Sequence, residues 1–294
     1  MPPIDQILWT LFYAGVLPAL LAAALMTVVC WLAGRFDPGP YIGAAVALAA
    51  GLALGNWLGD ELVPLWPERF GWQWLGWAVL GALALGMLAR LPFVPPGLGW
   101  GLWGLASANA GWLLTPASLR DEFFWAPLVL GAIIFAEWVV LEEVGRLDPA
   151  GLIPLALVPA ALTATALLVP SSARFGQIAL VLAGSLAGVG GGGLLMRREG
   201  SGVVAGVAVM LPGLILSGWH DNFAEPPVPT KCFLLAALAP LALVPSLIPA
   251  WQRYQRKGLW VVQLLIVLAP VITAIALAAQ AGALSMDANA EEEW

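Results

Sequence analysis

Residues 7–34 read ILWTLFYAGVLPALLAAALMTVVCWLAG, a stretch without a charged side chain. A helix that crosses a bilayer needs about 20 mostly apolar residues, because each residue advances the helix by about 1.5 Å. This stretch exceeds that length, and it is too long for the apolar part of a signal peptide. It is therefore predicted to be a retained transmembrane helix.

Similar apolar runs follow along the whole chain. Of its 294 residues, 61% are hydrophobic and 10% are charged, whereas soluble domains carry about 25% charged residues. Because a water-exposed surface needs more polar residues than this, the composition predicts an all-α, polytopic membrane bundle in one domain, residues 1–294. The ten predicted spans are Ile7–Gly34, Tyr41–Leu58, Trp72–Leu91, Gly97–Leu114, Phe123–Leu141, Gly151–Val169, Gly176–Met196, Val203–Ser217, Cys232–Ala250 and Leu259–Leu284.

Two of these runs fit a full span less well than the others. Gly97–Leu114 is rich in Gly and Trp, and Val203–Ser217 is short. The division of the ten runs also leaves two descriptions open. The chain is either one undivided bundle or two halves, 1–147 and 148–294, related as an inverted repeat of the kind found in many transporters.

Basic residues divide unevenly between the connectors, which indicates an orientation. Cytoplasmic connectors are enriched in Arg and Lys, so we expect odd-numbered connectors inside and both termini outside, in the plasma (inner) membrane. The odd connectors hold eight such residues and the even ones four: Arg35, Arg90, Arg146, Arg197, Arg198, Arg253, Arg256 and Lys257 against Arg69, Arg120, Arg174 and Lys231.

Glu137 is the first candidate functional residue, because it is a carboxylate inside the apolar run Ile133–Val140. A charge near the middle of a membrane costs at least about 2.5–3.5 kcal/mol, so such residues usually mark an ion pathway or a paired site. Glu137 could carry a proton. The alternative is that it lies one turn from the inner boundary and either reaches the headgroups or pairs with Arg90 or Arg146.

A broken helix is the second candidate. Pro240 and Pro245 lie within one predicted span, and each removes a backbone hydrogen bond. Transporters use such breaks to expose carbonyl groups to ions, although a simple packing kink explains the prolines too. Asn56 and Asn109 are buried-polar candidates for the same pathway, and each could instead bond to a neighbouring helix.

The predicted outer connector Ser217–Phe223 holds the sole histidine of the chain, His220, beside Asp221. This pair could sense pH or bind a polar solute. The alternative is a polar turn that caps two helices.

Two series of glycines recur every fourth residue and predict helix contact faces. Small residues on one helix face let two backbones approach closely. The glycine run at 190–193 offers a second interpretation, a hinge or unwound stretch. The two series are Gly51, Gly55 and Gly59, and Gly184, Gly188 and Gly192.

No catalytic, metal or cofactor motif stands out in the sequence, and the net charge of −6 gives no electrostatic reason to expect nucleic acid. Two functions remain open. The first is a small permease that moves a proton-coupled, lipidic or weakly polar solute through Glu137 and the broken helix. The second is a non-catalytic subunit that packs against other membrane proteins. The expected partners are the lipid bilayer and, for the second function, other membrane subunits.

Overall fold

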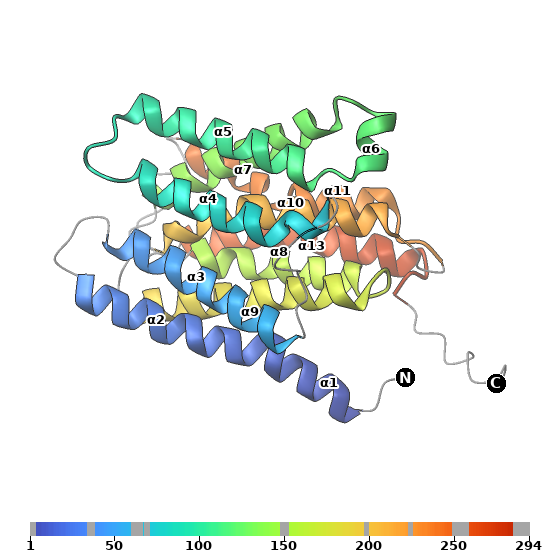
Figure 1. Cartoon of the computed structure of the whole chain (residues 1–294). Helices are drawn as coiled ribbons and strands as arrows, with labels where there is room; N and C mark the ends of the chain where they lie inside the picture. The colour runs from blue at the N-terminus through green and yellow to red at the C-terminus, as the bar shows by residue number, and fades with distance from the viewer. Residues whose placement is uncertain are drawn as a thin grey trace.

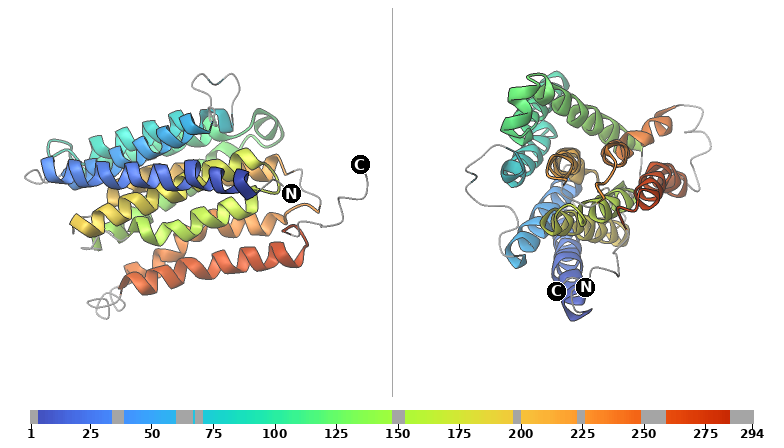
Figure 2. Two further views of the ribbon diagram at one scale, coloured as in Figure 1. Left: turned by 90° about the horizontal axis from the view of Figure 1, so that it is seen from below. Right: turned by 90° about the vertical axis from the view of Figure 1, so that its right-hand side faces the viewer.

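The structure is a computed structural model that describes residues 4–33, 39–59, 67, 71–147, 153–196, 200–222, 226–248 and 259–284. All regular secondary structure in these ranges is helical. The helices form one bundle in which most axes run roughly parallel or antiparallel (Figure 1). Helix α1 begins and helix α13 ends at the same end of this bundle (Figures 1 and 2).

The first half of the bundle begins with one long helical stretch that contains a short π-helical turn, η1. In chain order its elements are α1 (Ile4–Leu11), η1 (Phe12–Val16), α2 (Leu17–Ala33), α3 (Gly39–Leu58), η2 (Trp72–Trp74), α4 (Leu75–Ala89), α5 (Pro96–Leu114), α6 (Ala117–Glu122) and α7 (Ala126–Leu147).

The second half contains α8 (Ile153–Leu168), α9 (Ala173–Met196), η3 (Ser201–Val203), α10 (Val204–His220), α11 (Thr230–Ala237), η4 (Ala239–Leu247) and α13 (Leu259–Gln280). Helix α10 lies near the centre of the bundle when this is viewed end-on (Figure 2). Its central position explains why nearly all of its side chains are buried.

Six helices of the described residues are long and apolar enough to cross a membrane. A seventh crossing is possible if α11 and η4, which meet at a bend of 41°, form one broken span. The six are Leu8–Leu32, Gly39–Leu58, Trp72–Ala89, Ala173–Met196, Ser201–His220 and Val262–Gln280. The chain is thus consistent with a helical membrane bundle, and the total of ten spans stays a prediction.

Helix bounds differ from those predicted at several of the spans. The eighth run, predicted as Val203–Ser217, is longer, because η3 and the last turn of α10 extend it to Ser201–His220. In the sixth run, α8 covers Ile153–Leu168 and ends one residue before the predicted Val169, and the predicted start at Gly151 lies outside the described residues. Helix α7 carries several charged residues and α5 is rich in Gly and Trp, and neither is among the six.

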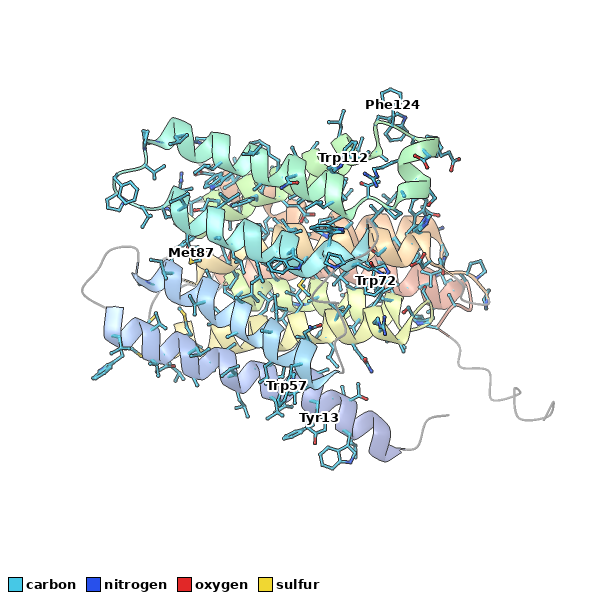
Figure 3. All side chains as sticks on the ribbon, viewed as in Figure 1. Tyr13, Trp57, Trp72, Met87, Trp112 and Phe124 are labelled. Carbon is cyan, nitrogen blue, oxygen red and sulfur yellow. The ribbon has the colours of Figure 1, made fainter. Side chains whose placement is uncertain are left out.

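The outer surface of the bundle carries large apolar side chains. Leu20 is 61% exposed and Trp57 is 72% exposed, and Figure 3 shows Tyr13 and Trp57 pointing away from the bundle. Such a surface is costly in water and favourable in lipid, and aromatic rings of this kind are enriched at the membrane boundary. The surface therefore supports the same class of protein as the helix lengths do.

Glycines let the helices approach one another most closely between α9 and the first helical stretch. A Cβ atom at Gly184 would overlap the carbonyl oxygen of Gly15, and one at Gly188 would overlap that of Ala19. A Cβ at Gly192 would lie 3.0 Å from the carbonyl oxygen of Ala23. The three glycines thus place one face of α9 directly against backbone.

The other predicted glycine series, on α3, also lies at a close contact between helices. A Cβ at Gly51 would lie 2.5 Å from Ser185 Oγ, and one at Gly55 would overlap Val181, so α3 also packs against α9. Helix α9 is continuous from Ala173 to Met196. The alternative of an unwound stretch at 190–193 is therefore wrong, because packing on both faces holds these glycines in a regular helix.

We predict that Gly188→Ala destabilises the protein strongly, since one methyl group there meets a backbone carbonyl that cannot rotate away. Overpacking of this kind costs about 1–3 kcal/mol or more. Gly191→Ala is the matched control, because a Cβ at Gly191 meets nothing within 4 Å. Thermal unfolding in detergent should show a lower melting temperature for the first variant and an unchanged or raised one for the second. Equal melting temperatures would contradict the close approach of α9 and α2.

Candidate functional site

Glu137 lies at the middle of α7, which runs from Ala126 to Leu147. Helix geometry places it about 15 Å from the last residue of the helix. Its side chain is 0% exposed. The alternative that Glu137 reaches the headgroups is therefore wrong, because α7 continues about six residues beyond the predicted end at Leu141 and protein covers the carboxylate.

The two arginines considered as partners of Glu137 are both bound to other acids. Arg90 at the end of α4 forms an ion pair with Glu142, and Arg146 pairs with Glu143 at 2.6 Å. Neither carboxylate oxygen of Glu137 has a hydrogen-bond partner among the described residues. The predicted pairing alternatives are thus wrong as well, and a buried carboxylate without a partner is costly as an anion.

Helix geometry indicates what Glu137 faces. Gly131 contacts α5, since a Cβ there would lie 3.1 Å from the carbonyl oxygen of Ser107. Glu137 comes six residues later, so it points about 120° away from Gly131 around the helix. Besides α5, the main neighbours of α7 are α10 and η4. The buried carboxylate therefore faces the region of α10 and η4 and not the tight contact with α5.

Segment η4 is the second part of the broken helix. The chain leaves α11 at Leu238 and continues as a 3-10 helix through Ala239–Leu247, with Pro240 buried and Pro245 half-buried. Pro240 lies about 14 Å from Leu247, the last residue of η4, at the 3-10 rise. The break predicted from the prolines is present, and it lies on an element that packs against the helix of Glu137.

A second buried carboxylate, Glu142, escaped sequence reasoning because it stands next to Glu143 near a basic connector. Glu142 is 0% exposed and its partner Arg90 is 28% exposed. The Arg90 guanidinium also lies over the ring of Tyr41, 5.2 Å from the ring centre. The pair therefore links α3, α4 and α7 at the end of the bundle that holds the α4–α5 turn (Figure 1).

Two buried tryptophans follow this ion pair toward the middle of the bundle. The rings of Trp103 and Trp138 stack with centres 5.6 Å apart. Both indole N–H groups and the hydroxyl of Ser107 are buried without a hydrogen-bond partner among the described residues. An indole nitrogen can only donate, so each of these buried groups costs free energy that a water or ligand oxygen would recover.

The outer polar loop has a structural explanation. His220 Nε2 lies 3.1 Å from Ser118 Oγ of α6, and Asn222 accepts a hydrogen bond from Ser171 at 3.1 Å. Trp219 donates to Thr230 Oγ1 at 3.2 Å. These contacts join the end of α10 to α6, to the α8–α9 turn and to α11. His220 and Asp221 thus lie in a turn that holds neighbouring helix ends together. This turn is separate from Glu137.

The two asparagines do not gather around Glu137. Asn109 is exposed on the outer face of α5, and Asn56 is half-buried near the end of α3. The described site therefore consists of Glu137 with the neighbouring broken helix, and of the Arg90–Glu142 pair. Buried Gln263 on α13 has two polar atoms without partners among the described residues and adds a further polar group in the second half of the chain, which also contains η4.

Comparisons with protein-family models, with curated proteins and with solved structures gave no significant match. The class of protein thus follows from the fold alone. The described chain is an all-helical bundle with six helices fit to cross a membrane, and it buries one unpartnered carboxylate and one ion pair.

We predict opposite effects on stability for the two buried carboxylates. Glu137→Gln removes a charge that has no partner, so the melting temperature in detergent should stay the same or rise. Glu142→Gln leaves Arg90 uncompensated and should lower stability, by less than the about 3–5 kcal/mol typical of fully buried pairs, because Arg90 is partly exposed. A loss for Glu137→Gln as large as that for Glu142→Gln would mean that Glu137 has an ionic partner.

Proposed function

We propose that this protein is a small permease-like transporter that couples the movement of a lipidic or weakly polar solute to protons, with Glu137 as the proton-binding residue. One observation carries the proposal. Glu137 is fully buried halfway along α7, with neither oxygen bonded among the described residues. A carboxylate held in this way is expensive to maintain for structural reasons alone, and intramembrane carboxylates commonly serve proton transfer.

The position of the broken helix supports the same proposal. A continuous helix satisfies its own backbone groups, whereas a 3-10 segment with prolines leaves carbonyl groups for other partners. Segment η4 lies against the helix of Glu137. A solute between these two elements would meet backbone carbonyls on one side and a carboxyl group on the other.

Coupling follows from the cost of burying charge. Without a proton, Glu137 is an anion whose enclosure in a dry bundle is unfavourable, so the deprotonated protein should favour a state in which water reaches the carboxylate. A bound proton removes this cost and permits the closed state. The protein would therefore change between states mainly when Glu137 is protonated, which links each movement of solute to a proton.

The alternative, a non-catalytic subunit of a membrane complex, rests on the extensive glycine packing and the apolar surface. Those features fit any membrane bundle, and a purely structural subunit gives no reason for the unpartnered Glu137. The transport experiment below distinguishes the two functions, because a structural subunit moves no solute on its own.

We predict that Glu137→Gln abolishes the pH dependence of solute uptake while the protein still folds and inserts. Purified protein in liposomes would be tested with a panel of lipidic and weakly polar solutes, with and without an inward proton gradient. Glu143→Gln is the control, since Glu143 lies on the same helix but is partly exposed. If no solute enters faster with wild-type protein than with empty liposomes, the accessory-subunit function replaces this one.

We also predict the orientation from the distribution of basic residues. Phe93 in the α4–α5 turn is 74% exposed, and Phe124 between α6 and α7 is 83% exposed and points outward in Figure 3. In a background without Cys30 and Cys232, a cysteine at position 124 should react with an impermeant thiol reagent added outside intact cells. A cysteine at position 93 should react only after the membrane is opened. The reverse pattern would place the termini in the cytoplasm.

A further inference from the structure

The register between α7 and the central helix α10 follows from two contacts. A Cβ at Gly145 would lie 3.0 Å from the Cβ of Ser201. A Cβ at Gly86 would lie 3.1 Å from the Cβ of Ala205 and 3.3 Å from Trp138 Cζ2, so these two side chains also meet. The contacts advance along η3 and α10 while they go back along α7. The two helices therefore run antiparallel.

This register places Ala208 of α10 at the level of Glu137. Glu137 lies eight residues before Gly145, about 12 Å along α7. Ala208 lies seven residues after Ser201, about 11 Å in the same direction along α10. Seven residues are close to two helical turns, so Ala208 returns to the side of α10 that meets α7. Ala208 is 0% exposed, and its backbone thus lies in the interior beside the helix of Glu137.

Pro212 interrupts the backbone hydrogen bonds of α10 at this level. It lies inside the helix and is buried. A proline has no N–H group, so the carbonyl oxygen of Ala208, four residues earlier, lacks the donor that a regular helix supplies. Glu137 points about 80° around α7 from Gly145, on the side away from α5. Since Gly145 faces η3 at the start of α10, this direction leads from α10 toward η4, the other main neighbour of α7.

Segment η4 contributes further carbonyl groups to the region that Glu137 faces. Pro240 and Pro245 both lack an N–H group, so two backbone donors are missing from this short 3-10 helix. Glu137 thus lies between two elements whose prolines leave carbonyl oxygens without helical donors. A protonated carboxyl group donates one hydrogen bond, whereas a metal cation is bound by several oxygens at once, and transporters use carbonyls of broken helices in this way.

Few charged groups surround Glu137. The described parts of α5, α8, α10, η3 and η4, which pack against α7, contain no Asp, Glu, Lys or Arg. On α7 itself, Glu142 and Glu143 are paired with arginines. The remaining titratable groups of the neighbours lie near the start of α7, about 17 Å along the helix from Glu137. They are Arg120, Asp121 and Glu122 of α6 and His220, which contacts α6.

This charge distribution limits the type of cation. The described residues contain no group of three or more His, Cys, Asp or Glu side chains that could hold a metal ion. A multivalent ion that needs several such ligands therefore does not fit. The single carboxylate of Glu137 balances one positive charge, and a divalent ion would leave excess charge in an apolar interior, which is costly.

We propose that Glu137, the carbonyl oxygen of Ala208 and the carbonyls of η4 form a binding site for a small monovalent metal cation, with Na⁺ as the probe. The proposal rests on the proposed function, because it takes Glu137 as the residue that the coupled ion neutralises. A bound Na⁺ removes the cost of the buried anion as a proton does, and it also gives the carbonyl oxygens a partner. Either ion permits the closed state, so a Na⁺ gradient drives uptake as a proton gradient does.

The experiment measures Na⁺ binding by the purified protein in detergent and needs no solute. The melting temperature is recorded in alkaline buffer while NaCl replaces N-methyl-D-glucamine chloride at constant ionic strength. A ligand that binds only the folded state raises the melting temperature once its concentration exceeds the dissociation constant. The wild-type protein should gain about 2 °C or more with Na⁺. Glu137→Gln should gain nothing, and Glu143→Gln should respond as the wild type does.

A backbone variant tests the Ala208 carbonyl separately. Pro212→Ala supplies an N–H group that bonds to this carbonyl within the helix, so the protein should fold and require about tenfold more Na⁺ for the same shift. Pro159→Ala is the matched control, because Pro159 also lies inside a helix, α8. The residue four before it, Leu155, faces α9, where a Cβ at Gly190 would lie 2.5 Å from its Cγ. The Na⁺ requirement of this control should equal that of the wild type.

Failure of the cation site and failure of the transport function give different results. No rise with Na⁺ in the wild-type protein, or an equal rise in Glu137→Gln, would overturn the site. An unchanged Na⁺ requirement in folded Pro212→Ala would exclude the Ala208 carbonyl from it. If Na⁺ stabilises the protein through Glu137 but liposomes take up no solute, the site stands and the proposed transport is wrong. If Glu137→Gln abolishes the pH dependence of uptake but Na⁺ does not stabilise the wild type, the transport stands and Glu137 carries protons alone.

Discussion

The interior of a bilayer offers no water to solvate charge, and the structure depends on how this chain meets that constraint. Nearly all polar backbone groups are satisfied inside helices. Some hydroxyl groups are satisfied in the same way, since Thr163 and Ser217 donate to the carbonyl oxygen four residues earlier on their own helix. The two buried carboxylates on α7 pose a larger problem, because each can carry a charge. Glu142 is compensated by Arg90, and Glu137 is not compensated by any described residue.

The same constraint explains why the helices pack as they do. Lipid is as apolar as leucine, so helices gain little by burying leucine against one another and rely on close approach instead. Gly184 and Gly188 bring α9 onto the backbone of the first helical stretch, and Gly51 brings α3 onto Ser185 of α9. These three helices are thus joined by close backbone approach.

Sequence reasoning predicted the helical membrane class and the regions of most helices, because apolar length and glycine spacing are local properties. It placed the break in the ninth span, since prolines act on their own backbone. It erred where an answer depended on helix ends and on partners distant in the chain. The end of α7 was placed at Leu141 because Glu142 and Glu143 look like a boundary. The structure shows that Arg90, some fifty residues earlier, compensates Glu142 and allows the helix to continue to Leu147.

The pairing of Glu142 with Arg90 also changes how Glu137 is interpreted. At a predicted distance of one turn from the boundary, Glu137 could have been an ordinary interfacial residue. With Glu142 neutralised by Arg90, the apolar part of α7 extends beyond Glu137 and leaves it near the middle of the helix. The ion pair therefore removes a partner that Glu137 would otherwise take. A carboxyl group without a partner at this depth is least costly when it is protonated and neutral, which is the state that the proposed proton-binding role requires.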